Sequence, residues 1–200
     1  MKKLLAAAAA AAFLCLPGVA AAQDYSDTAA ADTGHDFAGP RVEARIGWET
    51  PTVSDGTGAV YKVGQAVSYG GEVGFDAKVG NKVTLGAYAN YDVSNVDVCD
   101  GTDCLGEKGN LSAGGRIGFV LSPSVVLYVK GGYNSITMKA KSGGFTGEET
   151  KGGVGGALGA EFVLKKNLYA FVEGNYADYG DFFGINLQRR HVAAGVGVRF

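Results

Sequence analysis

Four short aromatic segments recur along the chain at intervals of about 40 residues, and they restrict the possible folds more than any other feature. These segments are IGWET, ANYDV, GGYNS and GNYAD, which contain Trp48, Tyr91, Tyr133 and Tyr176. A second series, VGFDA, IGFVL, AEFVL and VGVRF, recurs at similar intervals and contains Phe75, Phe119, Phe162 and Phe200. A period of this length indicates a repeated supersecondary unit. The sequence therefore predicts four copies of one unit.

Within each copy, apolar residues alternate with polar or small ones, as in HVAAGVGVRF at residues 191–200. Alternation with period two is typical of a β-strand whose two faces meet different surroundings. The chain also contains 33 glycines and 10 tyrosines, which favour twisted strands over helices. The pattern predicts four hairpins with strands at residues 41–50, 66–79, 83–95, 109–121, 125–138, 152–164, 168–178 and 188–200.

The predicted connections alternate between short and long. Three of them, at residues 80–82, 122–124 and 165–167, are tight turns rich in Gly, Pro, Ser and Asn. The other four, at residues 51–65, 96–108, 139–151 and 179–187, are expected to be long polar loops. Short turns at one end and long loops at the other are typical of an outer-membrane barrel, with the turns in the periplasm.

The two faces of the predicted strands differ sharply in charge. One face is apolar, whereas the other carries long residues of both signs. The predicted charge network consists of Arg41, Glu43, Arg45, Glu72, Asp76, Arg116, Lys130, Glu161, Glu173 and Arg199, with Lys78 and Asp92 on the same face. Burying unpaired charges is costly, whereas a barrel lumen can pair and hydrate them. We expect pairing between neighbouring strands, and we expect lumen glycines such as Gly195 and Gly197 to leave some water-filled space.

Two architectures could satisfy this pattern: a soluble barrel that turns its apolar face to a partner, and a barrel embedded in lipid. The aromatic residues favour the second. The first series lies near the long-loop ends of strands, and the phenylalanine series lies near the opposite ends, as two interfacial aromatic belts would. We therefore predict an all-β fold, an eight-stranded antiparallel up-and-down transmembrane β-barrel at residues 41–200.

The first 40 residues predict export. Residues 1–22 combine two lysines, an apolar run and a small-residue cleavage site, which is typical of a signal peptide for the general secretory pathway. Residues 23–40 are acidic and lack alternation, so we expect a flexible lead-in. The chain without its signal peptide has no basic patch, which argues against nucleic-acid binding.

The segment VGVRF, with Val196, Val198 and Phe200, resembles the C-terminal signature of bacterial outer-membrane barrels. The resemblance implies that the barrel-assembly machinery reads these three residues as an assembly signal. The stretch 40–200 as a whole is similar to the eight-stranded family of opacity proteins and outer-membrane-protein-A-like barrels. Nothing follows the last strand, so we expect no peptidoglycan-binding domain. We expect the protein to be located in the bacterial outer membrane and to be surrounded by its lipid. We also expect it to be a monomer.

Three features of the sequence are candidate chemical sites. His191 is the one candidate base in the barrel, but it lacks a His-x-Ser motif, and we expect it to hydrogen-bond a lumen carboxylate. The segment GGVGGALGAEF does not fit a phosphate loop. Cys99 and Cys104 are expected to form a loop disulfide in an exported protein, because two thiols alone make a poor zinc site. No catalytic, cofactor or metal site is predicted.

The leading functional hypothesis is a non-enzymatic structural and surface-interaction protein that presents four extracellular loops to an unidentified ligand. A narrow channel for small solutes is the second hypothesis. A barrel enzyme that modifies lipid is the third.

Overall fold

The computed structural model describes residues 37–54, 60–62, 64–94, 96–101, 103–142, 144–182 and 185–200. The predicted signal peptide and residues 23–36 of the predicted lead-in lie outside these ranges. Residues 39 and 40, which the sequence assigned to the lead-in, are already part of the first strand.

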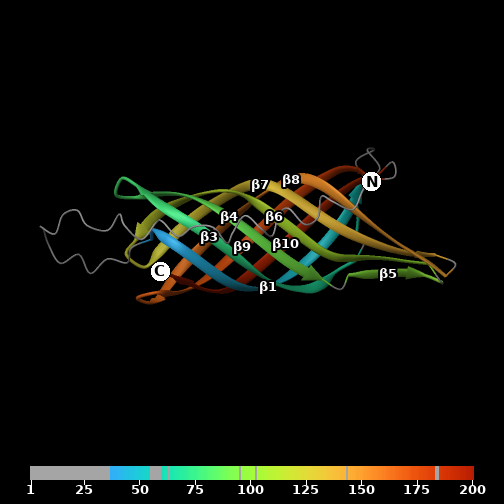
Figure 1. Cartoon of the computed structure of the whole chain (residues 1–200), viewed down its shortest axis with the longest axis horizontal. Helices are drawn as coiled ribbons and strands as arrows, with labels where there is room; N and C mark the ends of the chain where they lie inside the picture. Colours follow the sequence, from blue (N-terminus) through green and yellow to red (C-terminus); the bar gives the residue numbers. More distant parts are fainter. Residues whose placement is uncertain are drawn as a thin grey trace, which may run out of the picture. The chain divides into compact units, whose positions relative to one another are not determined.

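All regular structure in the described residues is β-strand, as Figure 1 shows. The strands are β1 (Gly39–Ser54), β2 (Val60–Lys62), β3 (Ala66–Val79), β4 (Val83–Ser94), β5 (Asp97–Asp100), β6 (Asp103–Ser122), β7 (Val125–Ser142), β8 (Phe145–Lys165), β9 (Leu168–Phe182) and β10 (Ile185–Arg199). Over the described ranges, no helix has the length and apolar character that crossing a membrane requires.

Eight of these strands close into a ring. Consecutive strands β1, β3, β4, β6, β7, β8, β9 and β10 pair as antiparallel neighbours, and β10 returns to pair with β1. That closing register runs from Arg41 opposite Arg199 to Ser54 opposite Asn186. The two short strands lie outside the ring: β2 pairs with β1, and β5 pairs with β6. Closure satisfies the backbone groups of β1 and β10, so the predicted eight-stranded antiparallel barrel is confirmed.

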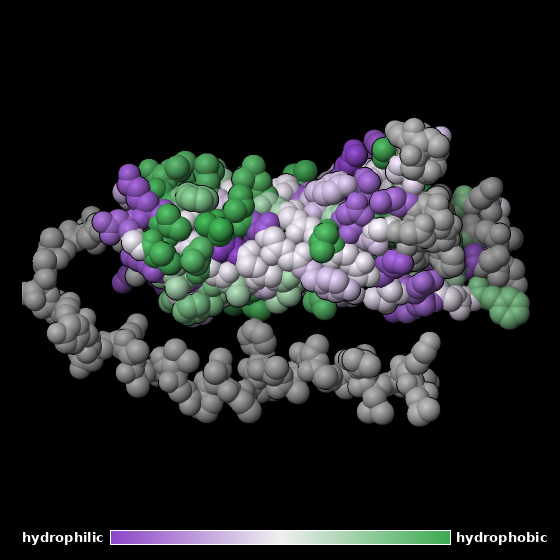
Figure 2. All heavy atoms as spheres, turned by 90° about the horizontal axis from the view of Figure 1, so that it is seen from above, coloured by the Kyte–Doolittle hydropathy of each residue, from purple (hydrophilic) through white to green (hydrophobic). Residues whose placement is uncertain are grey.

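The predicted faces are also on the expected sides of the ring. Apolar residues such as Ile46, Leu158 and Val192 point outward and are exposed. The charged residues point inward and are buried. In Figure 2, hydrophobic residues gather on the barrel near one end, and hydrophilic ones gather toward the other. An apolar outer face and a charged interior are the reverse of the arrangement in a soluble protein, and they suit a barrel surrounded by lipid.

The three predicted short turns join β3 to β4, β6 to β7 and β8 to β9, all at one end of the barrel. Opposite them lies what we call the outer end. Here the prediction of four long loops was wrong for the described residues, because most of those at 96–108, 139–151 and 179–187 are strand, as are residues 51–54 and 60–62. Residues 55–59 and 63 of the first predicted loop lie outside the described ranges. The register of β7 with β8 continues without interruption from Val125 opposite Phe162 to Ser142 opposite Phe145.

These extensions are stable strands because the inward side chains change character at the outer end. Ile136, Met138, Ala177, Tyr179 and Leu187 form a buried apolar cluster there, with Val53 and Leu105 packed against it. Outward residues at the same level are polar, as in an ordinary soluble sheet. The polar outward residues and the glycines made these segments resemble loops in the sequence. The core is therefore charged in the middle of the barrel and apolar at its outer end.

Candidate functional site

All ten residues of the predicted charge network lie buried in the lumen. One centre of the network is Asp76 on β3. Its Oδ2 atom accepts hydrogen bonds from Arg41 at 3.1 Å, Arg116 at 2.6 Å and Arg199 at 3.0 Å. Glu161 on β8 binds Arg116 at 2.6 Å and Arg199 at 3.2 Å. Two carboxylates therefore hold three guanidinium groups at one level of the lumen.

The second centre is Glu72, also on β3. It binds Arg41 at 2.7 Å, Arg45 at 3.0 Å and Lys130 at 2.7 Å. Glu173 on β9 binds Arg45 at 2.7 Å and Lys130 at 2.6 Å. Most of these pairs join strands that are not neighbours, such as β3 with β7. The network therefore crosses the lumen, whereas the sequence analysis expected pairing between adjacent strands.

Aromatic side chains fill the remaining space between the charged groups. Glu43 accepts a hydrogen bond from the hydroxyl of Tyr169 at 2.8 Å, in addition to its ion pair with Arg41 at 2.6 Å. The guanidinium of Arg116 stacks 4.1 Å from the ring centre of Tyr128. The expectation that lumen glycines leave space for water was wrong at Gly197, where an added Cβ would collide with the ring of Tyr169. Eight strands enclose an interior narrow enough for side chains to fill, and at Gly197 the ring of Tyr169 occupies the space.

A second group of charges lies in the lumen nearer the outer end, and the sequence analysis missed most of it. Arg189 on β10 donates to Glu49 on β1 through both Nε, at 2.7 Å, and Nη2. Its Nη2 lies 3.5 Å from Asp92, and its Nε lies 3.5 Å from Glu107. Arg189 thus faces three buried carboxyl groups, one of which, Asp92, also lies 3.3 Å from the Nε of Arg45, whereas the ten predicted residues balance five cations with five carboxylates. Glu107 fell in a predicted loop, so its inward direction could not be read from the sequence.

The carboxyl group of Glu107 lies beyond the level of the aromatic belt, outside the membrane-spanning segments. Burial raises its pKa to about 8; the attraction of Arg189 opposes this rise, and repulsion from Glu49 and Asp92 adds to it. Met138 of the apolar cluster lies opposite Glu107 in the register of β6 with β7. The group is therefore held mainly as the neutral acid at neutral pH.

His191 does not hydrogen-bond a carboxylate, contrary to the expectation from sequence. Its Nε2 lies 2.8 Å from the hydroxyl oxygen of Ser68, while its Nδ1 lies 3.9 Å from Asp92. The side-chain amide of Asn175 donates to Nδ1 at 3.5 Å. With Nδ1 accepting from Asn175, Nε2 carries the proton and donates to Ser68.

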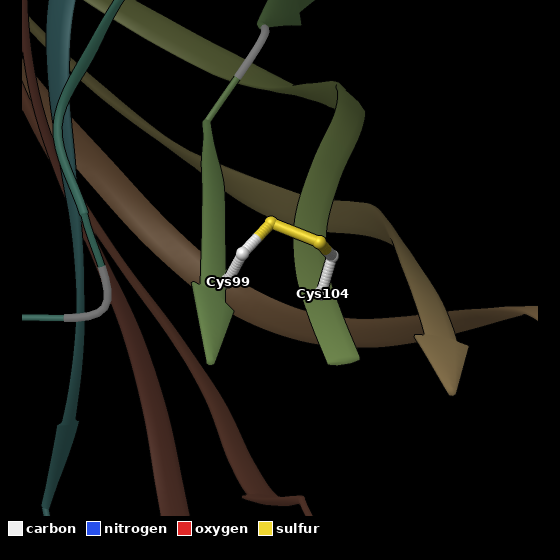
Figure 3. Close-up of a disulfide and its surroundings, with 2 residues drawn as sticks. All are labelled: Cys99 and Cys104. Atoms are coloured by element: carbon white, nitrogen blue, oxygen red, sulfur yellow. A yellow bond between two sulfur atoms is a disulfide. The ribbon is translucent and has the colours of Figure 1, made fainter. Parts of the chain in front are cut away.

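Cys99 and Cys104 are joined by a disulfide with an S–S distance of 2.02 Å. Figure 3 shows that the bond connects two adjacent strands, β5 and β6, and not two points of an irregular loop. The two cysteines face each other directly in the register of this hairpin, whose turn contains Gly101 at a φ of 63°. The disulfide therefore ties the short strand β5 to the long strand β6.

The disulfide belongs to a sheet that extends beyond the ring, to the right in Figure 1, and that we call the β5–β8 arm. The arm comprises β5 and the outer parts of β6, β7 and β8, namely residues 97–101, 103–108, 137–142 and 144–150. A hollow of about 480 Å³ on it is lined by Ser94, Asp97, Cys99, Cys104, Gly106, Glu107, Lys108, Lys139, Lys141 and Glu148. Lys108 forms an exposed ion pair with Glu148 at 3.0 Å. At the tip, the side chain of Phe145 is 84% exposed.

The residues of the predicted assembly signal face outward on β10 and directly after its end. Phe200 is 70% exposed, and Val196 and Val198 are also accessible from outside the ring. The backbone N–H of Phe200 donates to the carbonyl of Pro40 at 2.9 Å. The end of β10 is thus joined to the start of β1 at the end of the barrel that carries the short turns.

No group of His, Cys, Asp and Glu residues in the described part of the chain has the arrangement of a metal site. A comparison with functionally curated proteins found no match. Among solved structures, Neisserial surface protein A is similar, with 15% identity and a TM-score of 0.57 over 80% of this chain and 97% of that one. Ail of Yersinia pestis is similar with 14% identity and a TM-score of 0.51 over 80% and 99%.

At such identities these likenesses establish the fold alone. The family profile described as outer membrane protein beta-barrel domain matches residues 6–200. This match includes the entire ring and places the chain in the bacterial outer membrane. The closed ring, its outward apolar face and its charged lumen all agree with that assignment. The chain therefore belongs to the outer membrane protein β-barrel family.

Proposed function

We propose that this protein is a non-enzymatic surface-interaction protein that uses the β5–β8 arm to contact partners outside the cell. The observation that carries the proposal is the arm itself, a disulfide-tied sheet that extends beyond the ring and ends in an exposed aromatic residue. Export through the general secretory pathway and assembly by the barrel-assembly machinery are part of the same proposal.

Several features support a binding role for the arm. A large exposed aromatic side chain with polar surroundings is typical of the centre of a protein interface. Phe145 has this character, since Lys139, Lys141 and Lys108 lie on the strands behind it. Tying β5 to β6 lowers the flexibility of the surface, and a preorganised surface loses less entropy when it binds. Ail and Neisserial surface protein A, which share the fold, are named for attachment and for a surface location.

The test is binding of the purified barrel, in lipid nanodiscs, to immobilised extracellular-matrix proteins and to lipopolysaccharide. We expect saturable binding to at least one of them, and we expect Phe145→Ser to weaken it by about thirtyfold, the effect of losing a hot-spot aromatic. Tyr61→Ser is the matched control, because Tyr61 is an exposed aromatic on β2, away from the arm. Equal loss in both variants, or no binding at all, would contradict the role of the arm.

The lipid-modifying alternative rests on the contact between Ser68 and His191. Both side chains are buried in the lumen, away from lipid, and the hydrogen bond from Asn175 favours the unreactive tautomer of the histidine. We therefore expect a fluorophosphonate probe to leave Ser68 unmodified. Labelling that Ser68→Ala abolishes would instead support a hydrolase.

A further inference from the structure

The lipid-facing surface of the barrel has a shallow hollow of about 470 Å³ over β8, β9 and β10. Its sides are formed by outward side chains that are well exposed: Leu158, Tyr176 and Val192. Gly156 and Gly174 have no side chain, so they form the floor of the hollow between these three side chains. We call this feature the β8–β10 groove. The lining also includes Ala157, Asn175 and His191, and Arg190 lies at one end of it.

Arg190 lies at the height of the outer aromatic belt. It is opposite Tyr176 in the register of β10 with β9, and it is opposite Thr50, two residues beyond Trp48, in the register with β1. On the other seven strands of the ring, an outward and exposed residue of the outer part of the strand is apolar or aromatic: Trp48, Tyr69, Tyr91, Leu111, Tyr133, Val154 and Tyr176. Arg190 therefore adds a positive charge to an otherwise uncharged series of outward side chains.

The charge of Arg190 is not balanced by the protein. Its neighbour Arg189 points inward and pairs with Glu49, whereas Arg190 is exposed and forms no ion pair with any described residue. The nearest outward carboxylate by register is Asp178, opposite Gln188, and its Oδ1 already accepts a hydrogen bond from Gly180 at 2.8 Å. An unpaired guanidinium at a membrane interface is suited to bind a phosphate, whose oxygens match its two parallel donors.

We propose that the β8–β10 groove binds one phosphorylated, acylated glycolipid of the outer leaflet. An acyl chain lies on Gly156 and Gly174 between the side chains of Leu158, Tyr176 and Val192, and a phosphate contacts Arg190. The groove supplies apolar area for the chain, and the cation supplies selectivity for the headgroup. The outer leaflet is specified because Arg190 is at the end opposite the short turns, which outer-membrane barrels place in the periplasm.

The experiment is native mass spectrometry of the detergent-solubilised barrel titrated with lipid A that carries two phosphates. We expect one tightly retained lipid per barrel. Arg190→Gln should lower the affinity about tenfold or more, as expected for loss of a charge-assisted pair. Gly174→Leu should have a similar effect by filling the groove, because an added Cβ at Gly174 has no atom within 4 Å and the backbone need not move.

Two variants serve as controls. Gly115→Leu makes the same change at a lipid-facing glycine on β6, away from the groove, and Lys141→Gln removes an exposed cation from the arm. Both should bind lipid A like the original chain. All variants should retain the faster gel mobility of an unheated barrel, which shows that the ring is closed. Unchanged affinity in Arg190→Gln, or equal binding of dephosphorylated lipid A or phosphatidylglycerol, would overturn the proposal.

Discussion

At the scale of the residue, the carboxyl group of Glu107 shows how the lumen changes toward its outer end. It lies beside two other carboxyl groups and a single arginine, next to the apolar cluster that contains Met138. Such surroundings favour the neutral acid, in contrast to the balanced network around Asp76 and Glu72. Stability at the outer end should therefore depend on pH in a direction opposite to that of an ordinary salt-bridged carboxylate.

The pKa of Glu107 is raised from 4.5 to about 8 in the folded protein. Below pH 4.5 both folded and unfolded states hold the proton, so the group has no effect on stability. Between pH 4.5 and 8 the unfolded state loses its proton first, and stability falls as the pH rises. Glu107→Gln should abolish this decline. Guanidinium unfolding in vesicles, followed by the fluorescence of the single tryptophan Trp48, measures it. Parallel pH profiles for the two proteins would contradict the assignment.

At the scale of the element, the β5–β6 hairpin is held by its disulfide as well as by its register. The two cysteines are five residues apart, so the closed loop is small and the stabilisation should be below the ~3 kcal/mol expected for a loop of 15 residues. We expect reduction to increase amide exchange in β5 while the ring stays protected. Mass spectrometry of exported protein should find it two hydrogens lighter than the dithiol. Two thiols that react with an alkylating agent on fresh membranes would refute the bond.

Cysteine labelling can test which end of the barrel faces the outside of the cell. The substitution Thr146→Cys places a thiol in the arm, and Asn81→Cys places one in the short turn between β3 and β4. In intact cells, a membrane-impermeant maleimide should label the first and leave the second unmodified until the cells are lysed. Labelling of both to the same degree would remove the basis for assigning the arm to the outside. Cys99 and Cys104 are disulfide-bonded, and the protein without either substitution gives the background level of labelling.

The last strand should matter more for assembly than for stability. Phe200 is exposed on the lipid side, and its backbone N–H donates a hydrogen bond to the carbonyl of Pro40. Deleting it should reduce the amount of folded barrel in the membrane severalfold, while the folded fraction unfolds at nearly the same guanidinium concentration. Deletion of the residue with unchanged insertion would mean that this strand end carries no assembly signal.

At the scale of the whole molecule, the period-two alternation, the aromatic repeat and the spacing of the short turns together predicted the ring. Because side chains alternate between the two faces of a strand, the sequence predicts which residues face the lumen, including all ten charged residues of the network. Their partners could not be predicted, because contacts such as Glu72 with Lys130 depend on register and barrel diameter. The arm was missed because Lys139, Glu148 and neighbouring glycines are polar or small on the outward face. The inward alternation of Ile136 and Met138 was the signal that could have revealed it.

The combined charge inventory of the lumen leads to the last prediction. Five cations and five carboxylates cross the middle of the barrel, and the apolar cluster packs its outer end. We therefore expect only small, intermittent conductance from the barrel in a planar bilayer. Arg116→Ala and Glu161→Ala should each raise it, because either change removes a group that spans the lumen, whereas Lys108→Ala on the arm should not. A large and steady conductance from the unmodified barrel would show that the network opens, and the channel hypothesis would then replace the surface role as the leading one.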